Sequence, residues 1–163
     1  MRADVAEIVE EMARILVVDD DPNIRQVVRF ALGDEGHQVE EASDGRAALE
    51  QADRFHPDVI LLDMKMPGMD GWEFARRYRA RYGRRAATVV LTAAHDAGRR
   101  ARDIGADGYV AKPFDLDVLF ARVDEAARGA ARRMTTTVRS PSTHTDPTPA
   151  EDSPPGSASH FAR

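Results

Sequence analysis

The stretch ILVVDDDP at residues 15–22 decides the fold of this chain. Its first four residues are all apolar, which predicts a strand that is buried on both faces. An Asp directly before a Pro is typical of a helix start, with Asp21 as the cap and Pro22 at the first helical position. Apolar residues then recur at helical spacing until Gly33 and Gly36. The stretch therefore predicts a strand followed within a few residues by a helix.

Apolar runs and amphipathic segments keep alternating from this stretch to about residue 128. Strands are expected at residues 15–18, 38–42, 59–62, 88–91 and 109–110, and helices at 22–32, 47–52, 70–82, 96–104 and 115–128. The two strongest strands are apolar throughout, so both of their faces must be covered. Such strands, alternating with helices, are typical of a parallel sheet between two helical layers. The sequence therefore predicts an α/β fold of five strand–helix units, (βα)5.

Composition divides the 163 residues into three parts. Residues 14–131 are the expected folded domain, long enough to bury a real core. Residues 1–13 are an acidic N-terminal extension. Residues 132–163 hold eleven Ser or Thr and five Pro with few large apolar residues. Such a segment cannot offset the entropy cost of ordering, so we expect a disordered tail, either inert or used for docking or modification.

Charge and cysteine content exclude several classes of protein. The chain has 23 Lys and Arg against 28 Asp and Glu, a net charge of -5, which argues against a bulk nucleic-acid coat or a polybasic membrane anchor. The absence of cysteine excludes disulfides, Cys-ligated zinc and iron–sulfur clusters. No apolar run approaches the length of a membrane span or a signal peptide. We therefore expect a cytoplasmic protein with neither a nucleic-acid nor a membrane partner.

Polar side chains follow four of the expected strands, where the ligands of open parallel sheets bind. They are Asp19, Asp20, Asp63, Thr92 and Lys112. Two carboxylates about 4 Å apart repel by roughly 4 kcal/mol at an effective dielectric of about 20, so the acidic residues call for a cation. Carboxylates without His or Cys nearby suit Mg²⁺. Each residue alone could be a helix cap or half of an ion pair, but together they describe a phosphoryl-transfer site.

Four motifs, in order, resemble the receiver domain of two-component response regulators, the CheY-like family. They are ILVVDDDP at 15–22, LLDMKMPGMDG at 61–71, LTA at 91–93 and GADGYVAKPF at 105–114. The resemblance covers residues 14–128. It implies a flavodoxin-like, doubly wound sheet of five parallel strands in the order 2-1-3-4-5.

The resemblance also implies how the acidic residues are used. Asp63 would be the phosphoacceptor, taking a phosphoryl group from a histidine kinase or a histidine phosphotransferase. Asp20 and Asp63 would bind Mg²⁺ directly, and Asp19 mainly through water. The backbone carbonyl of Lys65 would complete the protein ligands.

The remaining roles concern the response to phosphorylation. Lys112 would pair with the phosphoryl oxygens, and the peptide bond between Lys112 and Pro113 is expected to be cis. Thr92 would donate a hydrogen bond to another phosphoryl oxygen and move toward it. Tyr109 would then turn inward, into the space that Thr92 leaves. Phosphorylation adds a charge of about -1.5 to -2, enough to bias such a packing change.

The resemblance leaves the output open. Because nothing after residue 131 resembles an output domain, we expect a stand-alone receiver, a monomer or a phosphorylation-dependent dimer. It would bind an output protein through the face formed by residues 96–128, where Arg99, Arg100 and Arg102 lie. The alternative is a phosphorelay intermediate or phosphate sink. A phosphohydrolase is disfavoured because Lys65 stands where such an enzyme needs a second acid, so we expect no enzymatic activity beyond self-phosphorylation and self-dephosphorylation.

Overall fold

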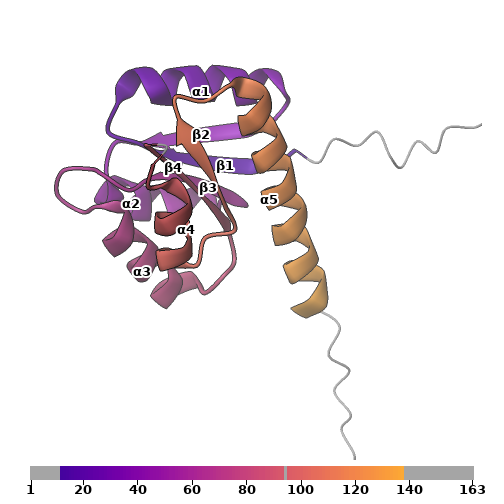
Figure 1. The fold of residues 1–163 in the computed structure, drawn as a ribbon. Coiled ribbons are helices and arrows are strands. Elements are labelled where there is room, and N and C mark those ends of the chain that lie inside the picture. Colours follow the sequence, from indigo (N-terminus) through magenta and orange to yellow (C-terminus); the bar gives the residue numbers. More distant parts are fainter. Residues whose placement is uncertain (1–11, 94, 138–163) are drawn as a thin grey trace, which may run out of the picture.

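Five parallel strands form one sheet in the order β2-β1-β3-β4-β5, with helices on both faces (Figure 1). The structure, a computed structural model, describes residues 12–93 and 95–137. The strands are β1 (Arg14–Val18), β2 (Gln38–Ala42), β3 (Val59–Asp63), β4 (Ala87–Ala93) and β5 (Gly108–Lys112). The helices are α1 (Pro22–Asp34), α2 (Gly45–Phe55), α3 (Gly71–Tyr82), α4 (Ala97–Ile104) and α5 (Leu116–Thr137). The predicted α/β class, element order and strand order are confirmed.

The helices begin where the sequence places an acidic cap. The carboxylate of Asp21 accepts a hydrogen bond from the backbone N–H of Asn23 at 2.9 Å, and Pro22 opens α1 as predicted. The carboxylate of Asp70 accepts from the backbone N–H of Glu73, also at 2.9 Å. Each cap satisfies a donor that the first helical turn leaves without a partner. Helices α1 and α3 thus follow the two strands, β1 and β3, whose carboxyl ends carry the acidic residues.

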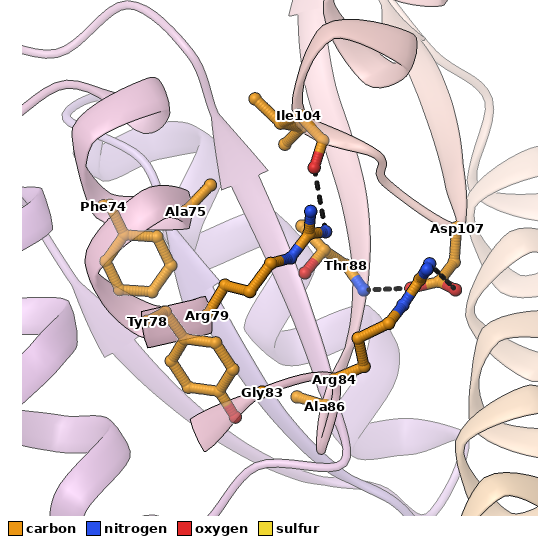
Figure 2. Close-up of a pocket in the computed structure, with 10 residues that line it drawn as sticks. All are labelled: Phe74, Ala75, Tyr78, Arg79, Gly83, Arg84, Ala86, Thr88, Ile104 and Asp107. Carbon is orange, nitrogen blue, oxygen red and sulfur yellow. Dashed lines mark hydrogen bonds and ion pairs between the residues drawn. The ribbon is translucent and has the colours of Figure 1, made fainter. Parts of the chain in front are cut away.

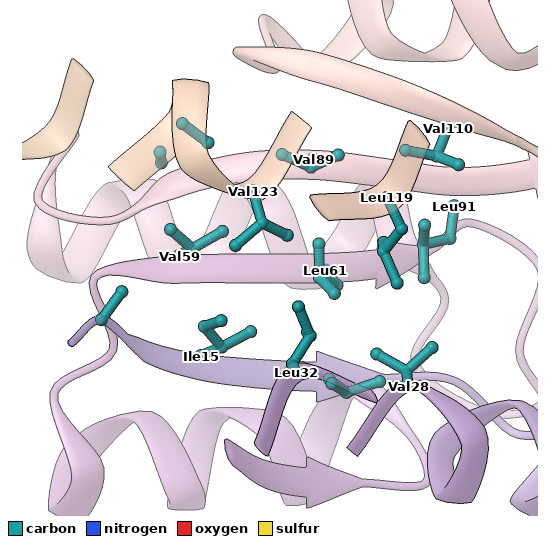
Figure 3. Packing of buried hydrophobic residues seen from close by; sticks show 14 of the residues in the cluster. Ile15, Val28, Leu32, Val59, Leu61, Val89, Leu91, Val110, Leu119 and Val123 are labelled. Carbon is teal, nitrogen blue, oxygen red and sulfur yellow. The ribbon is translucent and has the colours of Figure 1, made fainter. Parts of the chain in front are cut away.

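The sheet separates two apolar clusters. One lies under α1 and α5, where Val28, Leu32 and Leu119 pack on Ile15 and Leu61 (Figure 3). The other lies under α2, α3 and α4. Every residue of β3 is buried, which agrees with the four apolar residues that precede Asp63 in this strand. Because β3 lies at the centre of the sheet, its last residue is held by packing on both sides.

Helix α5 is longer than predicted. It was expected to end near Arg128, before a disordered segment, but it continues to Thr137. The helix still has an apolar face here, since Ala126 and Ala130 are buried, and Arg133 forms an ion pair with Asp107 at 2.8 Å. Residues 132–137 are therefore helical, while the rest of the expected tail and residues 1–11 of the extension lie outside the described residues. Even so, no helix within 12–93 and 95–137 combines the length and apolar character needed to cross a membrane.

Candidate functional site

Three carboxylates meet at the carboxyl end of the sheet. Asp19 and Asp20 directly follow β1, and Asp63 is the last residue of the neighbouring strand β3. One oxygen from each carboxylate can be chosen so that all three lie within 4.8 Å of one another. Asp19 and Asp63 are buried, whereas Asp20 is exposed at the rim. The structure thus brings together the three acidic residues expected to hold Mg²⁺, and their oxygens are the donors that this ion prefers.

Lys112, at the end of β5, reaches across to this cluster. Its Nζ atom lies 2.6 Å from Oδ2 of Asp19 and 3.9 Å from Oδ2 of Asp63. Asp19 has no exposed surface and also accepts a hydrogen bond from the backbone N–H of Asp21 at 2.9 Å. The peptide bond between Lys112 and Pro113 is cis, as expected. One ammonium group therefore partly neutralises two carboxylates.

The electrostatics of the cluster act most strongly on Asp63. Burial, together with the charge of Asp19, raises the pKa of Asp63 from its ordinary value of 3.8 to about 6. Lys112 and the backbone N–H of Lys65, which lies 3.3 Å from Oδ1, oppose the rise in pKa but do not cancel it. A cation at this position would favour the ionised carboxylate and lower the pKa.

This raised pKa predicts a pH-dependent penalty on the stability of the metal-free protein. Between about pH 4 and pH 6 the folded chain binds more protons at Asp63 than the unfolded chain does, so folding stability falls as the pH rises. The penalty is absent below about pH 4 and complete above about pH 6. We expect the free energy of unfolding of wild type, relative to Asp63→Asn, to fall by a few kcal/mol across this window. Urea denaturation of both proteins in EDTA measures the difference, and a pH-independent difference would contradict the prediction.

Thr92 lies beside the cluster and is held by an arginine of α4. Asp63 pairs in register with Leu91, so Thr92 is the next residue along β4. Thr92 is only 2% exposed, and its hydroxyl accepts a hydrogen bond from Nη1 of Arg100 at 2.7 Å. Nη2 of Arg100 donates to the carboxylate of Asp96 at 2.8 Å. The guanidinium also lies over the ring of Trp72, 5.5 Å from its centroid.

The burial of Arg100 corrects the interpretation of the arginines near α4. The sequence predicts that Arg100 lies with Arg99 and Arg102 on the face that binds a partner, but Arg100 is buried while the other two are exposed. One sequence signal could have shown this. Arg100 shares the spacing of the residues that face the core, which are Ala97, Ala101 and Ile104. A helical stripe that contains one arginine among apolar residues indicates a buried, partnered charge.

Two further expected site residues lie at the edges of this arrangement. Tyr109 is on the edge strand β5 and is 44% exposed, with its ring against Gly98 of α4, so this structure has Tyr109 turned outward. The side chain of Lys65 is exposed. The inward rotation of Tyr109 and the use of the Lys65 carbonyl as a metal ligand stay predictions.

Arg79 of α3 and Arg84 of the following loop contact neighbouring elements of the fold. Nη2 of Arg79 donates to the carbonyl oxygen of Ile104 at 2.9 Å (Figure 2). It also donates to the carbonyl oxygen of Gly105 at 3.2 Å, and so holds the end of α4. Arg84 forms an ion pair of 3.8 Å with Asp107. The C-terminal end of α4 is thereby fixed to its neighbours, and these arginines are not simply a solvated surface.

Comparison with known proteins agrees with this geometry. Residues 15–124 match the family model described as response regulator receiver domain. The chain is 44% identical to the response regulator MprA of Mycobacterium leprae over 112 residues, 68% of this chain and 49% of that protein. It is 38% identical to the transcriptional activator protein IrlR of Burkholderia pseudomallei over 128 residues, 77% of this chain and 55% of that protein. The chain thus spans about half the length of these relatives.

A solved structure extends the likeness to three dimensions. The chemotaxis protein CheY4 of Vibrio cholerae superposes with a TM-score of 0.66 at 36% sequence identity, covering 71% of this chain and 98% of that one. Residues 15–124, which match the family model, include the three carboxylates and Lys112.

Proposed function

The chain belongs to the receiver domain family of two-component response regulators, and from that premise we propose that it is a switch activated by phosphorylation of Asp63. The donor would be a phosphohistidine of a histidine kinase or of a histidine phosphotransferase. The observation that carries the proposal is the grouping of Asp63 with two further carboxylates and Lys112 at one edge of the sheet. This grouping supplies a nucleophile, ligands for a cation and a positive charge for the transferred group, which are the parts that phosphoryl transfer to a carboxylate uses.

The proposed reaction forms an acyl phosphate. A carboxylate oxygen of Asp63 attacks the phosphorus atom, the bond from phosphorus to the donor nitrogen breaks, and the imidazole leaves with that electron pair. The ammonium of Lys112, 3.9 Å from Asp63, is close enough to pair with a phosphoryl oxygen. The hydroxyl of Thr92 would donate to another. Both groups stabilise charge on the transferred group without themselves reacting.

The three carboxylates fit a divalent cation, and we propose Mg²⁺. Asp20 and Asp63 would bind the ion directly, Asp19 would act through water, and the Lys65 carbonyl would complete the set. When bound, the ion would neutralise charge on the phosphoryl oxygens. The complete burial of Asp19 and its pairing with Lys112 support an indirect role for this residue.

For the output, we propose a change of the face formed by residues 96–128 that alters binding of a partner protein. A switch is favoured over a phosphate sink because Arg100 ties the Thr92 hydroxyl to α4, which gives phosphorylation a route to this face. The sequence predicts that the protein has no nucleic-acid partner. The relatives do not support this prediction, because IrlR is named a transcriptional activator. We also propose that the chain has no enzymatic activity beyond its own phosphorylation and dephosphorylation.

Intact-mass analysis after incubation with acetyl phosphate tests the proposal. We expect wild type to gain one phosphoryl group in the presence of Mg²⁺ and none in EDTA, and Asp63→Asn to gain none in either. An adduct on Asp63→Asn would mean that another residue is the acceptor. If wild type gains no adduct and does not bind beryllofluoride, an analogue of the phosphoryl group, the proposed function is wrong.

A further inference from the structure

The buried side chain of Arg100 connects Thr92 to two helices. The hydroxyl of Thr92 accepts from Arg100, whose guanidinium also binds the carboxylate of Asp96 on the N-terminal side of α4. The same guanidinium packs against Trp72, at the start of α3. The side chain of Arg100 is 7% exposed, so its charge depends on these three partners.

We propose that Arg100 is a positioning residue that holds the Thr92 hydroxyl in the unphosphorylated protein, and that phosphorylation reaches α4 by breaking this hydrogen bond. The inference rests on the proposed function. It assigns to Arg100 a role that the family motifs in this sequence do not include, because Arg100 lies outside all four of them.

The hydrogen bond from Arg100 breaks when the Thr92 hydroxyl moves toward the phosphoryl group, which is the movement proposed for this residue. A Thr side chain occupies staggered χ1 wells, and a change of well moves its oxygen by roughly 2 Å. The bond from Arg100 is 2.7 Å long and would not survive such a displacement. A phosphoryl group, with three strong acceptor oxygens and a charge of about -1.5 to -2, is a strong acceptor for the hydroxyl hydrogen and would draw Thr92 toward it.

Release of Thr92 leaves Arg100 with a donor that has lost its buried acceptor. A buried donor without a partner is unfavourable, so the guanidinium must move toward solvent or carry the start of α4 with it. The start of α4 is the freer end, because the side chain of Asp96 makes no capping hydrogen bond there. The other end is held by the bonds from Arg79 to the carbonyl of Ile104 (Figure 2) and to that of Gly105. The expected movement is therefore a tilt of α4 about its C-terminal end.

This movement would also change the surroundings of Tyr109. Its ring lies against α4 at Gly98, where an added Cβ atom would be 3.6 Å away. A tilt of the N-terminal half of α4 alters this contact directly. Arg100 thereby links an event at Asp63 to the face proposed for the output.

The affinity for beryllofluoride in the presence of Mg²⁺ tests the inference. A contact made only in the unphosphorylated state stabilises that state, so its removal shifts the population toward the state that binds the analogue. We expect Arg100→Met to bind beryllofluoride about tenfold more tightly than wild type, near the lower end of what a hydrogen bond to a charged group contributes. Arg100→Lys, which keeps one donor group, should lie between the two. The matched control is Arg99→Met on the exposed side of the same helix, which should bind like wild type. Fluorine-19 NMR titration measures all four affinities.

The emission of Trp72 gives a second readout that does not depend on a variant of Arg100. Trp72 is the only tryptophan in the chain, so its emission reports the guanidinium above its ring. Binding of beryllofluoride should change the emission of wild type. Thr92→Val lacks the hydroxyl, and its emission without ligand should already resemble that of bound wild type.

The outcomes separate this inference from the proposed function. If wild type binds beryllofluoride and Arg100→Met binds it equally or more weakly, Arg100 does not restrain Thr92 and the inference alone is overturned. Unchanged Trp72 emission on binding to wild type would overturn it as well. If wild type itself does not bind the analogue in the presence of Mg²⁺, the proposed function fails and the inference fails with it.

Discussion

Replacing Lys112 by methionine should lower the free energy of unfolding of the metal-free protein by about 3 kcal/mol, and Mg²⁺ should restore much of the loss. The carboxylate of Asp19 has no exposed surface, and the Lys112 ammonium is 2.6 Å away. Without Lys112, Asp19 keeps the hydrogen bond from Asp21 but loses its counter-charge. Removal of one partner of a buried ion pair costs about 3–5 kcal/mol, and the partial exposure of Lys112 favours the lower end.

Urea denaturation in EDTA and in excess Mg²⁺ measures both effects. A cation that binds only the folded chain stabilises it in proportion to its affinity, and the missing positive charge should raise that affinity. The gain from Mg²⁺ should therefore be larger in Lys112→Met than in wild type. Lys65→Met is the matched control, because Lys65 is the only other lysine and its side chain is exposed. We expect Lys65→Met to change stability by less than about 0.5 kcal/mol. Equal stability of Lys112→Met and wild type would show that Asp19 does not need this partner.

Replacing Gly71 by alanine should have an effect of similar size, at the junction between the acceptor loop and α3. A Cβ atom at this position would lie 2.6 Å from the carbonyl oxygen of Asp63 and 2.7 Å from the Cα atom of Met64. Both are backbone atoms at the end of the buried strand β3, so neither can move without displacing the strand. We expect a loss of about 3 kcal/mol in unfolding free energy, at the upper end of what overpacking costs. Binding of Mg²⁺ should weaken too, because relief of the clash displaces the backbone of Asp63, a proposed ligand of the ion.

Gly129→Ala is the matched control for this prediction. Gly129 lies within α5, and a Cβ atom there would meet nothing within 4 Å. Alanine is the better helix former, so this variant should be more stable than wild type by about 0.5–1 kcal/mol. Thermal denaturation of the two variants separates a general effect of removing glycine from the specific clash at Gly71. If Gly71→Ala has the same melting temperature as wild type and binds Mg²⁺ equally well, the close packing of α3 on the end of β3 is refuted.

The order of elements was predictable because it depends on local patterns. The apolar runs at 15–18 and 59–62 predicted buried strands, and the Asp–Pro pair at 21–22 predicted a helix start. The carboxyl ends of parallel strands meet at one edge of the sheet. The sequence therefore predicts that Asp19, Asp63 and Lys112 lie close together. The observed distances among them agree with this expectation.

Lengths and boundaries were less predictable. The last strand was expected at 109–110 but spans Gly108–Lys112, and α5 continues to Thr137. Both extensions depend on partners from elsewhere in the chain. Strand β5 is completed by pairing with β4, and the end of α5 is held by the bond from Arg133 to Asp107. The composition of residues 132–163 reports only the local preference of that segment. It does not show contacts with distant residues such as Asp107.

The alternation of strands and helices along the chain, and the set of residues at the carboxyl edge of the sheet, follow from hydrophobic periodicity and from the residue that ends each strand. How strongly those residues act on one another depends on the packing of the folded chain. The raised pKa of Asp63, the complete burial of Asp19 and the bond from Arg100 to Thr92 each depend on groups from at least two elements. Burial and distance are properties of the packed chain, and the same residues in an unfolded chain would show neither.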